Sequence, residues 1–127
     1  MQITAGIQWV ITCTTEFEQT AAFFQNIMGL TISDSGIPTT DLQFTRYVQF
    51  TLSNGAVLEV VEPQEHVREL YTAPIISFTV DSLTQAQRDL EQEHVEIVAP
   101  IVHTKDGWAW MYVRAPDGNI YQIQGPA

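Results

Sequence analysis

Cysteine and basic residues are both scarce in this sequence of 127 residues. The single cysteine, Cys13, has no second cysteine to pair with, so an intramolecular disulfide is excluded. A chain without disulfides is typical of a reducing compartment. The N-terminal MQITAGIQWV also lacks a basic region before a hydrophobic segment, which a secretory signal would have. The sequence therefore predicts a cytoplasmic location.

Lys and Arg together number 5 against 15 Asp and Glu, which gives a net charge of −10. Such a surface repels phosphate backbones and anionic lipid headgroups, so neither nucleic acid nor a membrane is expected as a partner. No apolar run approaches the ~20 residues that cross a bilayer. The acidic surface leaves neutral and cationic small molecules as the favoured ligands.

Several catalytic motifs are also missing. The sequence has no Gly-rich phosphate loop and no Cys/His cluster with metal-binding spacing. Cys13 lies in a strand-like stretch without a basic neighbour, which favours a buried hydrophobe over a nucleophile. His66 and His94 are interpreted as surface residues. His103 precedes a strand beside the expected cavity, where its imidazole would bind a ligand or titrate near neutral pH.

Two hairpins are the clearest features that are present. The last one, WAWMYVRAPDGNIYQIQ (residues 108–124), alternates aromatic or β-branched residues with polar ones around a Pro-Asp-Gly turn. The stretch RYVQFTLSNGAVLEVVE (residues 46–62) has the same plan around an Asn-Gly turn. Gly55 and Gly118 are 63 residues apart, which sets Glu59 opposite Gln122.

A strand and a helix precede each hairpin. Residues 3–14 predict a first strand, followed by a helix that Thr14 or Thr15 caps and Gly29 ends. Residues 75–80 predict the corresponding strand, followed by a helix that begins at Asp81 or Ser82, and residues 95–98 predict one more strand. The expected apolar helix faces are formed by Phe17, Ala21, Phe24 and Met28, and by Leu83, Ala86 and Leu90.

The order of elements in the first half is repeated in the second at an offset of 63 to 66 residues. We therefore predict an α+β fold in which two βαβββ modules form a curved mixed sheet with helices on its outer face. Module 1–63 and module 74–127, joined by residues 64–73, form one domain of residues 1–127.

The alternation within each fourth strand assigns its faces. If Leu58 and Val60 pack under the helix, Glu59 faces the concave side of the sheet. Likewise, Tyr121 and Ile123 face the helix while Gln122 faces the hollow. The opposite choice would bury Glu59 under a helix without a partner. We therefore expect Glu59 and Gln122 to line a cavity.

Two motifs resemble the vicinal oxygen chelate superfamily, which includes glyoxalase I, extradiol dioxygenases, and bleomycin- and fosfomycin-resistance proteins. AAFFQNIMGL (21–30) is similar to its "FY…LGL" helix end, and RAPDGNIYQI (114–123) is similar to its "DPDGN…E" hairpin. The resemblance covers essentially the whole chain. It implies a homodimer.

The resemblance also implies positions for a divalent metal, on the first and fourth strands of each module. Glu59 matches one position, Gln122 stands where many members have Glu, and Ile75 stands at another. The remaining position falls at Gln8 or Trp9: the count back from Phe23 favours Trp9, and strand polarity favours Gln8. One carboxylate with neutral amides suits zinc or iron poorly. We expect no metal and no other cofactor, with Glu59 and Gln122 as remnants of a metal site.

The leading hypothesis is a protein that binds a small organic molecule, aromatic or cationic, without catalysis. The alternative is a divalent-metal-dependent lyase, isomerase or dioxygenase that uses Glu59, with Gln8, Gln122 or a partner-chain residue as a further ligand. A third hypothesis makes Glu59 a metal-free base with a pKa raised by burial. The expected ligand-binding residues are Gln8, Trp9, Phe50, Glu59, Trp110 and Gln122.

Overall fold

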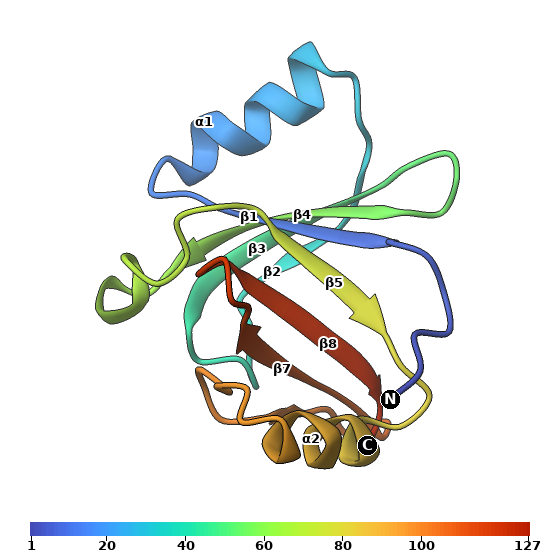
Figure 1. Cartoon of the computed structure of the whole chain (residues 1–127). Coiled ribbons are helices and arrows are strands. Elements are labelled where there is room, and N and C mark those ends of the chain that lie inside the picture. Colours follow the sequence, from blue (N-terminus) through green and yellow to red (C-terminus); the bar gives the residue numbers. More distant parts are fainter. The chain divides into compact units, whose positions relative to one another are not determined.

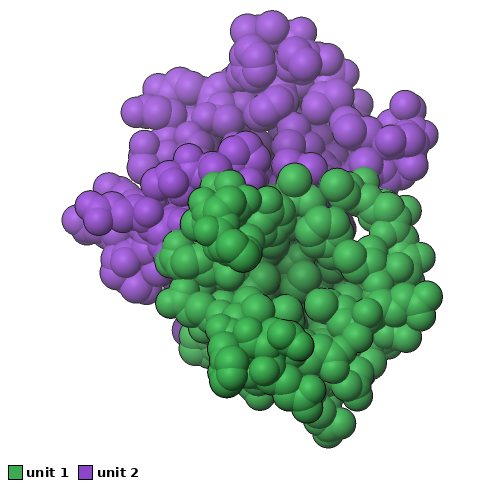
Figure 2. Space-filling view, viewed as in Figure 1, with its two compact units in different colours: residues 1–8, 75–127 green, residues 9–74 purple.

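The computed structural model describes all 127 residues (Figure 1). The chain forms two compact units, and Figure 2 colours them separately. Unit 1 contains residues 1–8 and 75–127, and unit 2 contains residues 9–74. The division of one domain into modules 1–63 and 74–127 stays a prediction. None of the helices is long and apolar enough to cross a membrane.

Unit 2 is one βαβββ module with strand order β2-β3-β4-β1. The β1 strand runs parallel to β4, while β2, β3 and β4 pair antiparallel. A short 3-10 helix, Glu65–Val67, follows β4. The elements of the module are β1 (Trp9–Cys13), α1 (Phe17–Ala22), β2 (Ile32–Gly36), β3 (Phe44–Thr51) and β4 (Val57–Pro63).

Unit 1 repeats this plan with strand order β5-β8-β7-β6. Here β5 runs parallel to β8, and β6, β7 and β8 pair antiparallel. The expected α+β fold of two βαβββ modules is therefore confirmed. The elements of this module are β5 (Ile75–Thr79), α2 (Leu83–Gln92), β6 (Val102–His103), β7 (Trp108–Arg114) and β8 (Ile120–Pro126).

Both predicted hairpin turns form at their glycines. Gly55 has φ +86° between β3 and β4, and Gly118 has φ +85° between β7 and β8. The turn at Gly55 sets Gln49 opposite Glu59, and the turn at Gly118 sets Tyr112 opposite Gln122. The turns thus fix which side chains share a face of each sheet.

Each unit packs one face of its sheet against its helix, as the alternation predicted. In unit 2, Val48 and Phe50 of β3 and Val60 of β4 form a core with Phe17, Ala21 and Phe24 packed against it. In unit 1, Leu83 and Ala86 of α2 pack with residues of β7 and β8, which include Ala109, Met111, Val113 and Ile123. Figure 1 shows α2 alongside β7 and β8.

The first helix ends differently from the prediction. A π-helix, Phe23–Ile27, continues α1, and the Met28 N–H donates to the Phe23 carbonyl five residues back. The wider turn shifts the phase of the helix face, so Met28 is 57% exposed and Leu30 packs against the core instead. Gly29 has φ +73°, as expected at the end of a helix.

Two predicted strands are shorter in the structure. The first strand begins at Trp9 rather than at residue 3, and Ile3 forms only an isolated bridge with Val80. Residues 95–98 do not form a continuous strand, and Ile97 makes an isolated bridge with Val113. The sequence signal for both was a run of β-branched residues, which favours extended backbone without supplying a partner strand.

Ser82 caps α2, as one of the two sequence alternatives predicted, and its Oγ accepts a hydrogen bond from the Gln85 N–H at 3.2 Å. We predict that Ser82→Ala lowers the free energy of unfolding by about 1 kcal/mol. Thermal melting checks this, with Thr84→Ala as the control on an exposed position of the same helix. Equal melting temperatures for the two variants would contradict the capping role.

Candidate functional site

Glu59 is a half-buried carboxylate on the face of the unit 2 sheet that is turned away from α1. It lies in β4 between Gln49 of β3 and Ile11 of β1. Gln49 donates a hydrogen bond from Nε2 to Glu59 Oε2 at 2.7 Å. The Trp9 side chain also donates to Glu59. Both partners are neutral, so Glu59 has no cationic partner on its own sheet.

The surroundings disfavour the charged form of Glu59. Burial is the largest effect and raises the pKa of Glu59 above its ordinary value of 4.5. The hydrogen bonds from Gln49 and Trp9 lower the pKa in part, while the nearby negative charges of Asp41 and Asp34 raise it. The charges that act on Glu59 are therefore acidic, and none of them stabilises its ionised form.

Cys13 lies near this carboxylate and is a poor nucleophile. Burial, together with the charges of Glu59 and Asp41, raises the pKa of the Cys13 thiol to about 12. The thiol therefore stays protonated at neutral pH, in keeping with the prediction that Cys13 acts as a small hydrophobe.

The raised pKa of Glu59 predicts a dependence of stability on pH. The native carboxyl binds its proton more tightly than the unfolded one, so the Glu59 contribution to the free energy of unfolding falls as pH rises above 4.5. The side chain in Glu59→Gln does not ionise. The Gln49 amide can rotate so that its oxygen accepts a hydrogen bond from the amide introduced at position 59. We therefore expect Glu59→Gln to gain stability relative to the unmodified protein as pH rises above 4.5.

Urea unfolding across this range measures the effect. Glu62→Gln is the matched control, because the Arg46 hydrogen bond lowers the pKa of Glu62. The Glu62 contribution changes with pH only below 4.5, so its variant should differ from the unmodified protein by a constant amount over the range. A difference for Glu59→Gln that is equally constant would contradict the raised pKa.

In unit 1, Gln122 lies on the sheet face that is turned away from α2 and is 6% exposed. Ser77 of β5 donates from Oγ to Gln122 Oε1 at 2.6 Å, and Gln122 Nε2 donates to the Tyr112 hydroxyl at 3.3 Å. Gln122 is therefore tied to its sheet on both sides of its amide. That Gln122 and Glu59 line one cavity stays a prediction.

The other expected site residues divide into two groups. Trp9 shares the face of Glu59, and Trp110 lies opposite Gln124 on the face of Gln122. Phe50 is 0% exposed in the core beneath α1, because β3 turns its even-numbered residues to the helix, so Phe50 leaves the candidate set. Gln8 is exposed and precedes the first residue of β1, which favours Trp9 over Gln8, and the role of either residue in binding stays a prediction.

The side chains around Glu59 and Gln122 are poorly suited to bind a divalent metal. The Glu59 carboxylate accepts hydrogen bonds from Gln49 and Trp9, and an indole N–H cannot ligate a metal. The Gln122 oxygen already accepts a hydrogen bond from the Ser77 hydroxyl. No three His, Cys, Asp or Glu side chains are arranged to hold a metal ion. We therefore derive no chemistry through a metal, and its absence from the protein in solution stays a prediction.

The sequence analysis did not identify the hydrogen-bond partners of Glu59 and Gln122, which are Gln49 and Ser77. Counting outward from the Asn-Gly turn places Gln49 opposite Glu59, so the hairpin register was a usable signal for this residue. Ser77 meets Gln122 through the parallel pairing of β5 with β8, whose register depends on the whole module rather than on a turn.

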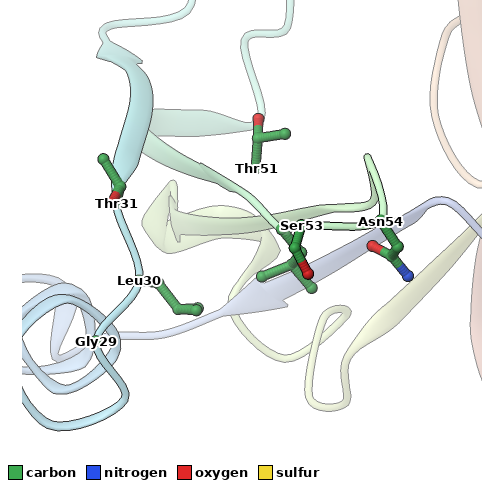
Figure 3. Close-up of a pocket in the computed structure, with 7 residues that line it drawn as sticks. Gly29, Leu30, Thr31, Thr51, Ser53 and Asn54 are labelled. Atoms are coloured by element: carbon green, nitrogen blue, oxygen red, sulfur yellow. The ribbon is translucent and has the colours of Figure 1, made fainter.

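A separate open pocket of about 510 Å³ lies in unit 2 between residues 29–31 and residues 51–54 (Figure 3). Its lining includes Leu30, Thr31 and Thr51, with Ser53 and Asn54 from the turn of the first hairpin. None of the lining residues is charged, and none belongs to the candidate set. We therefore assign the pocket no function.

The chain belongs to the Glyoxalase/Bleomycin resistance protein/Dioxygenase superfamily, whose family model matches residues 6–123. This match covers most of the chain and confirms the resemblance inferred from the two motifs. No curated protein sequence matches the chain.

Solved structures of low sequence identity share the fold. Methylmalonyl-CoA epimerase from Mycobacterium tuberculosis is 16% identical, with a TM-score of 0.75 over 100% of this chain and 93% of that chain. The hypothetical protein BH1468 from Bacillus halodurans C-125 is 13% identical, with a TM-score of 0.72 over 96% and 94%. A superfamily member from Vibrio splendidus 12B01 is 12% identical, with a TM-score of 0.66 over 91% and 95%. At these identities the likeness concerns the fold alone.

Proposed function

We propose that the protein binds a small aromatic cation, with Glu59 as the counter-ion and Trp9 beside it as an aromatic surface. The proposal places the ligand at the sheet face that carries Glu59. No reaction is needed, because burying the ligand against the sheet removes it from solution.

The observation that carries the proposal is a half-buried carboxylate without a cationic partner. A buried charge is costly unless it is paired, and Glu59 has only neutral donors and acidic neighbours. A ligand that brings a positive charge relieves this cost, whereas an anionic ligand increases it. Trp9 adds a ring that attracts a cation placed over its face.

Calorimetric titration with benzylammonium tests the proposal, with benzyl alcohol as the neutral control of similar shape. We expect benzylammonium to bind at least about tenfold more tightly, since a charged hydrogen bond adds roughly 1.5–3 kcal/mol. Equal affinities, or no binding of benzylammonium at millimolar concentration, would contradict a cation site.

A second function, proton transfer next to a carbonyl, is favoured by the raised pKa of Glu59. The M. tuberculosis structural neighbour is a methylmalonyl-CoA epimerase. Exchange of the α-hydrogen of methylmalonyl-CoA for deuterium is therefore the assay. Exchange in the unmodified protein that disappears in Glu59→Gln would support proton transfer, whereas equal exchange in the two proteins would contradict it.

The metal-dependent alternative has a direct test in the melting temperature of chelator-stripped protein. We expect no shift with nickel, zinc, manganese or iron(II). A native-state ligand at 100 times its dissociation constant adds about 2.7 kcal/mol, which is a shift of several degrees. A shift that disappears in Glu59→Ala would contradict the expectation and restore the metalloenzyme.

We also propose a cytoplasmic homodimer. The single cysteine is in keeping with that location, and the dimer is what the resemblance to the superfamily implies. Light scattering after size exclusion measures the oligomeric state, and a mass of 14.3 kDa at micromolar concentration would show a monomer instead.

A further inference from the structure

Four large apolar side chains are exposed around the end of the first helix in unit 2, and we call them the π-helix face. They are Phe23, Ile27 and Met28 of the helix end and Ile32 at the start of β2. Phe23 is 44% exposed and Ile27 is 75% exposed. The Met28 N–H donates to the Phe23 carbonyl, so these two residues are one π-helical turn apart on the same side. Ile32 lies opposite Phe50 and therefore on the sheet face that α1 covers.

The helix of unit 1 shows that this position in the fold does not require an apolar outer surface. The α2 helix follows β5 as α1 follows β1 (Figure 1), and it buries Leu83 and Ala86. The first helix and its π-helical continuation instead bury no residue and expose the π-helix face. An apolar outer surface on one of two equivalent helices is typical of a helix that a partner covers. Every exposed side chain of α2 is polar, and these are Thr84, Gln85, Arg88, Glu91 and Gln92.

The distribution of charge indicates which partner fits this face. Residues 19–33 contain no charged side chain, although the whole chain has a net charge of −10. Two copies of so acidic a protein repel each other, and the repulsion is smallest where neither copy carries a charge. A basic partner would instead be attracted to the acidic surface outside residues 19–33, and an acidic partner would be repelled. The π-helix face therefore fits a second copy of this chain better than it fits a charged partner.

Two-fold symmetry allows the face to cover itself. In a two-fold dimer each contact occurs twice, so Phe23 of each copy can pack against Met28 of the other copy. Contact between an aromatic ring and a thioether is favourable. A stable interface buries about 800 Å² per partner, which is more than four side chains provide. The exposed and uncharged Gln25 and Asn26 are available for its polar rim.

We propose that the π-helix face is the interface of a two-fold dimer of this chain. The inference rests on the homodimer proposed above and locates its interface. It does not involve Glu59, which lies on the opposite face of the unit 2 sheet. Ligand binding and association are therefore tested separately.

The three methionines of the chain provide the first test. Met1 and Met28 are 52% and 57% exposed, whereas Met111 is 0% exposed. A soluble paramagnetic probe broadens the NMR signal of every methionine methyl group that it can reach. Loss of one signal in Met28→Leu and of another in Met111→Leu assigns all three signals.

The measurement is made at a concentration where sedimentation equilibrium shows the dimer. We expect the Met1 signal to be broadened and the Met28 signal to be protected, as the Met111 signal is. Equal broadening of Met1 and Met28 in the dimer would overturn the proposal.

Sedimentation equilibrium of Ile27→Glu is the second test. Because Ile27 is exposed, the substitution leaves the core of unit 2 intact, and in the dimer it places an acidic group of each copy in the interface. We expect the dissociation constant of the dimer to rise at least about tenfold. Thr84→Glu is the matched control, since it adds the same charge at an exposed position of α2 and should leave the constant unchanged. An unchanged constant in Ile27→Glu, or an equal rise in the two variants, would overturn the proposal.

The outcome is distinguishable from that of the proposed function. An unmodified chain that stays monomeric would overturn the homodimer and its interface together, whereas a dimer that Ile27→Glu leaves intact would overturn the interface alone. Benzylammonium should bind Ile27→Glu as it binds the unmodified protein. Failure of benzylammonium to bind either protein, with the dimer intact in the unmodified one, would overturn the Glu59 site alone.

Discussion

Gly125→Ala is expected to lower the free energy of unfolding by about 3 kcal/mol, the largest single effect on stability that we predict. A Cβ at Gly125 would lie 2.4 Å from the Val80 carbonyl oxygen and 3.1 Å from Val80 Cγ2. The obstacle is backbone, and it cannot rotate away as the end of a side chain can. The strands β5 and β8 would have to separate where the Val80 N–H donates to the Gln124 carbonyl at 2.8 Å.

Thermal melting measures this effect, and the expected decrease is roughly 10 °C. Gly6→Ala is the matched control, since a Cβ at Gly6 meets nothing within 4 Å. Separation of the strands would also move Gln124 from Ser77 and weaken the hydrogen bond between them. Equal melting temperatures for Gly125→Ala and the Gly6→Ala control would contradict the close approach of Gly125 to Val80.

Glu59→Gln is expected to reduce the affinity for benzylammonium by about 10- to 100-fold, the largest effect on binding that we predict. The substitution keeps the size of the side chain and leaves the hydrogen bond with Gln49 available. It removes only the negative charge. The affinity for benzyl alcohol should therefore stay unchanged.

Calorimetry with both probes on both proteins separates charge from shape. Glu62→Gln is the matched control, because Glu62 also lies on β4 and its carboxylate already pairs with Arg46. We expect Glu62→Gln to bind benzylammonium as the unmodified protein does. An equal loss in the two variants would mean that the net charge, rather than Glu59, attracts the cation.

The modules were predictable because their signals are local. Asn54-Gly55 and Pro116-Asp117-Gly118 define two turns, and the alternation beside them assigns Leu58 and Val60 to the helix face. The π-helix that exposes Met28 was not predictable, since one extra residue in a helical turn leaves the apolar spacing almost unaltered.

The candidate site was predictable only in part. Glu59 followed from strand alternation, and the same alternation places Phe50 on the helix face once its pairing with Leu58 is known. The hydrogen bonds of Ser77 with Gln122 and Gln124 were not recognised, because they depend on β5 lying beside β8 and on the orientation of two amides. Neither property has a local signal in the sequence. The close approach at Gly125 likewise depends on where Val80 lies.

The most direct measurement of the central claim is the titration of the Glu59 carboxyl carbon by NMR, with and without benzylammonium. The free protein should titrate above 4.5, because burial and acidic neighbours disfavour the charged form. A bound cation favours that form, so the pKa should fall when benzylammonium is present. A Glu59 pKa that stays the same with and without the cation would contradict the assignment of Glu59 as the counter-ion.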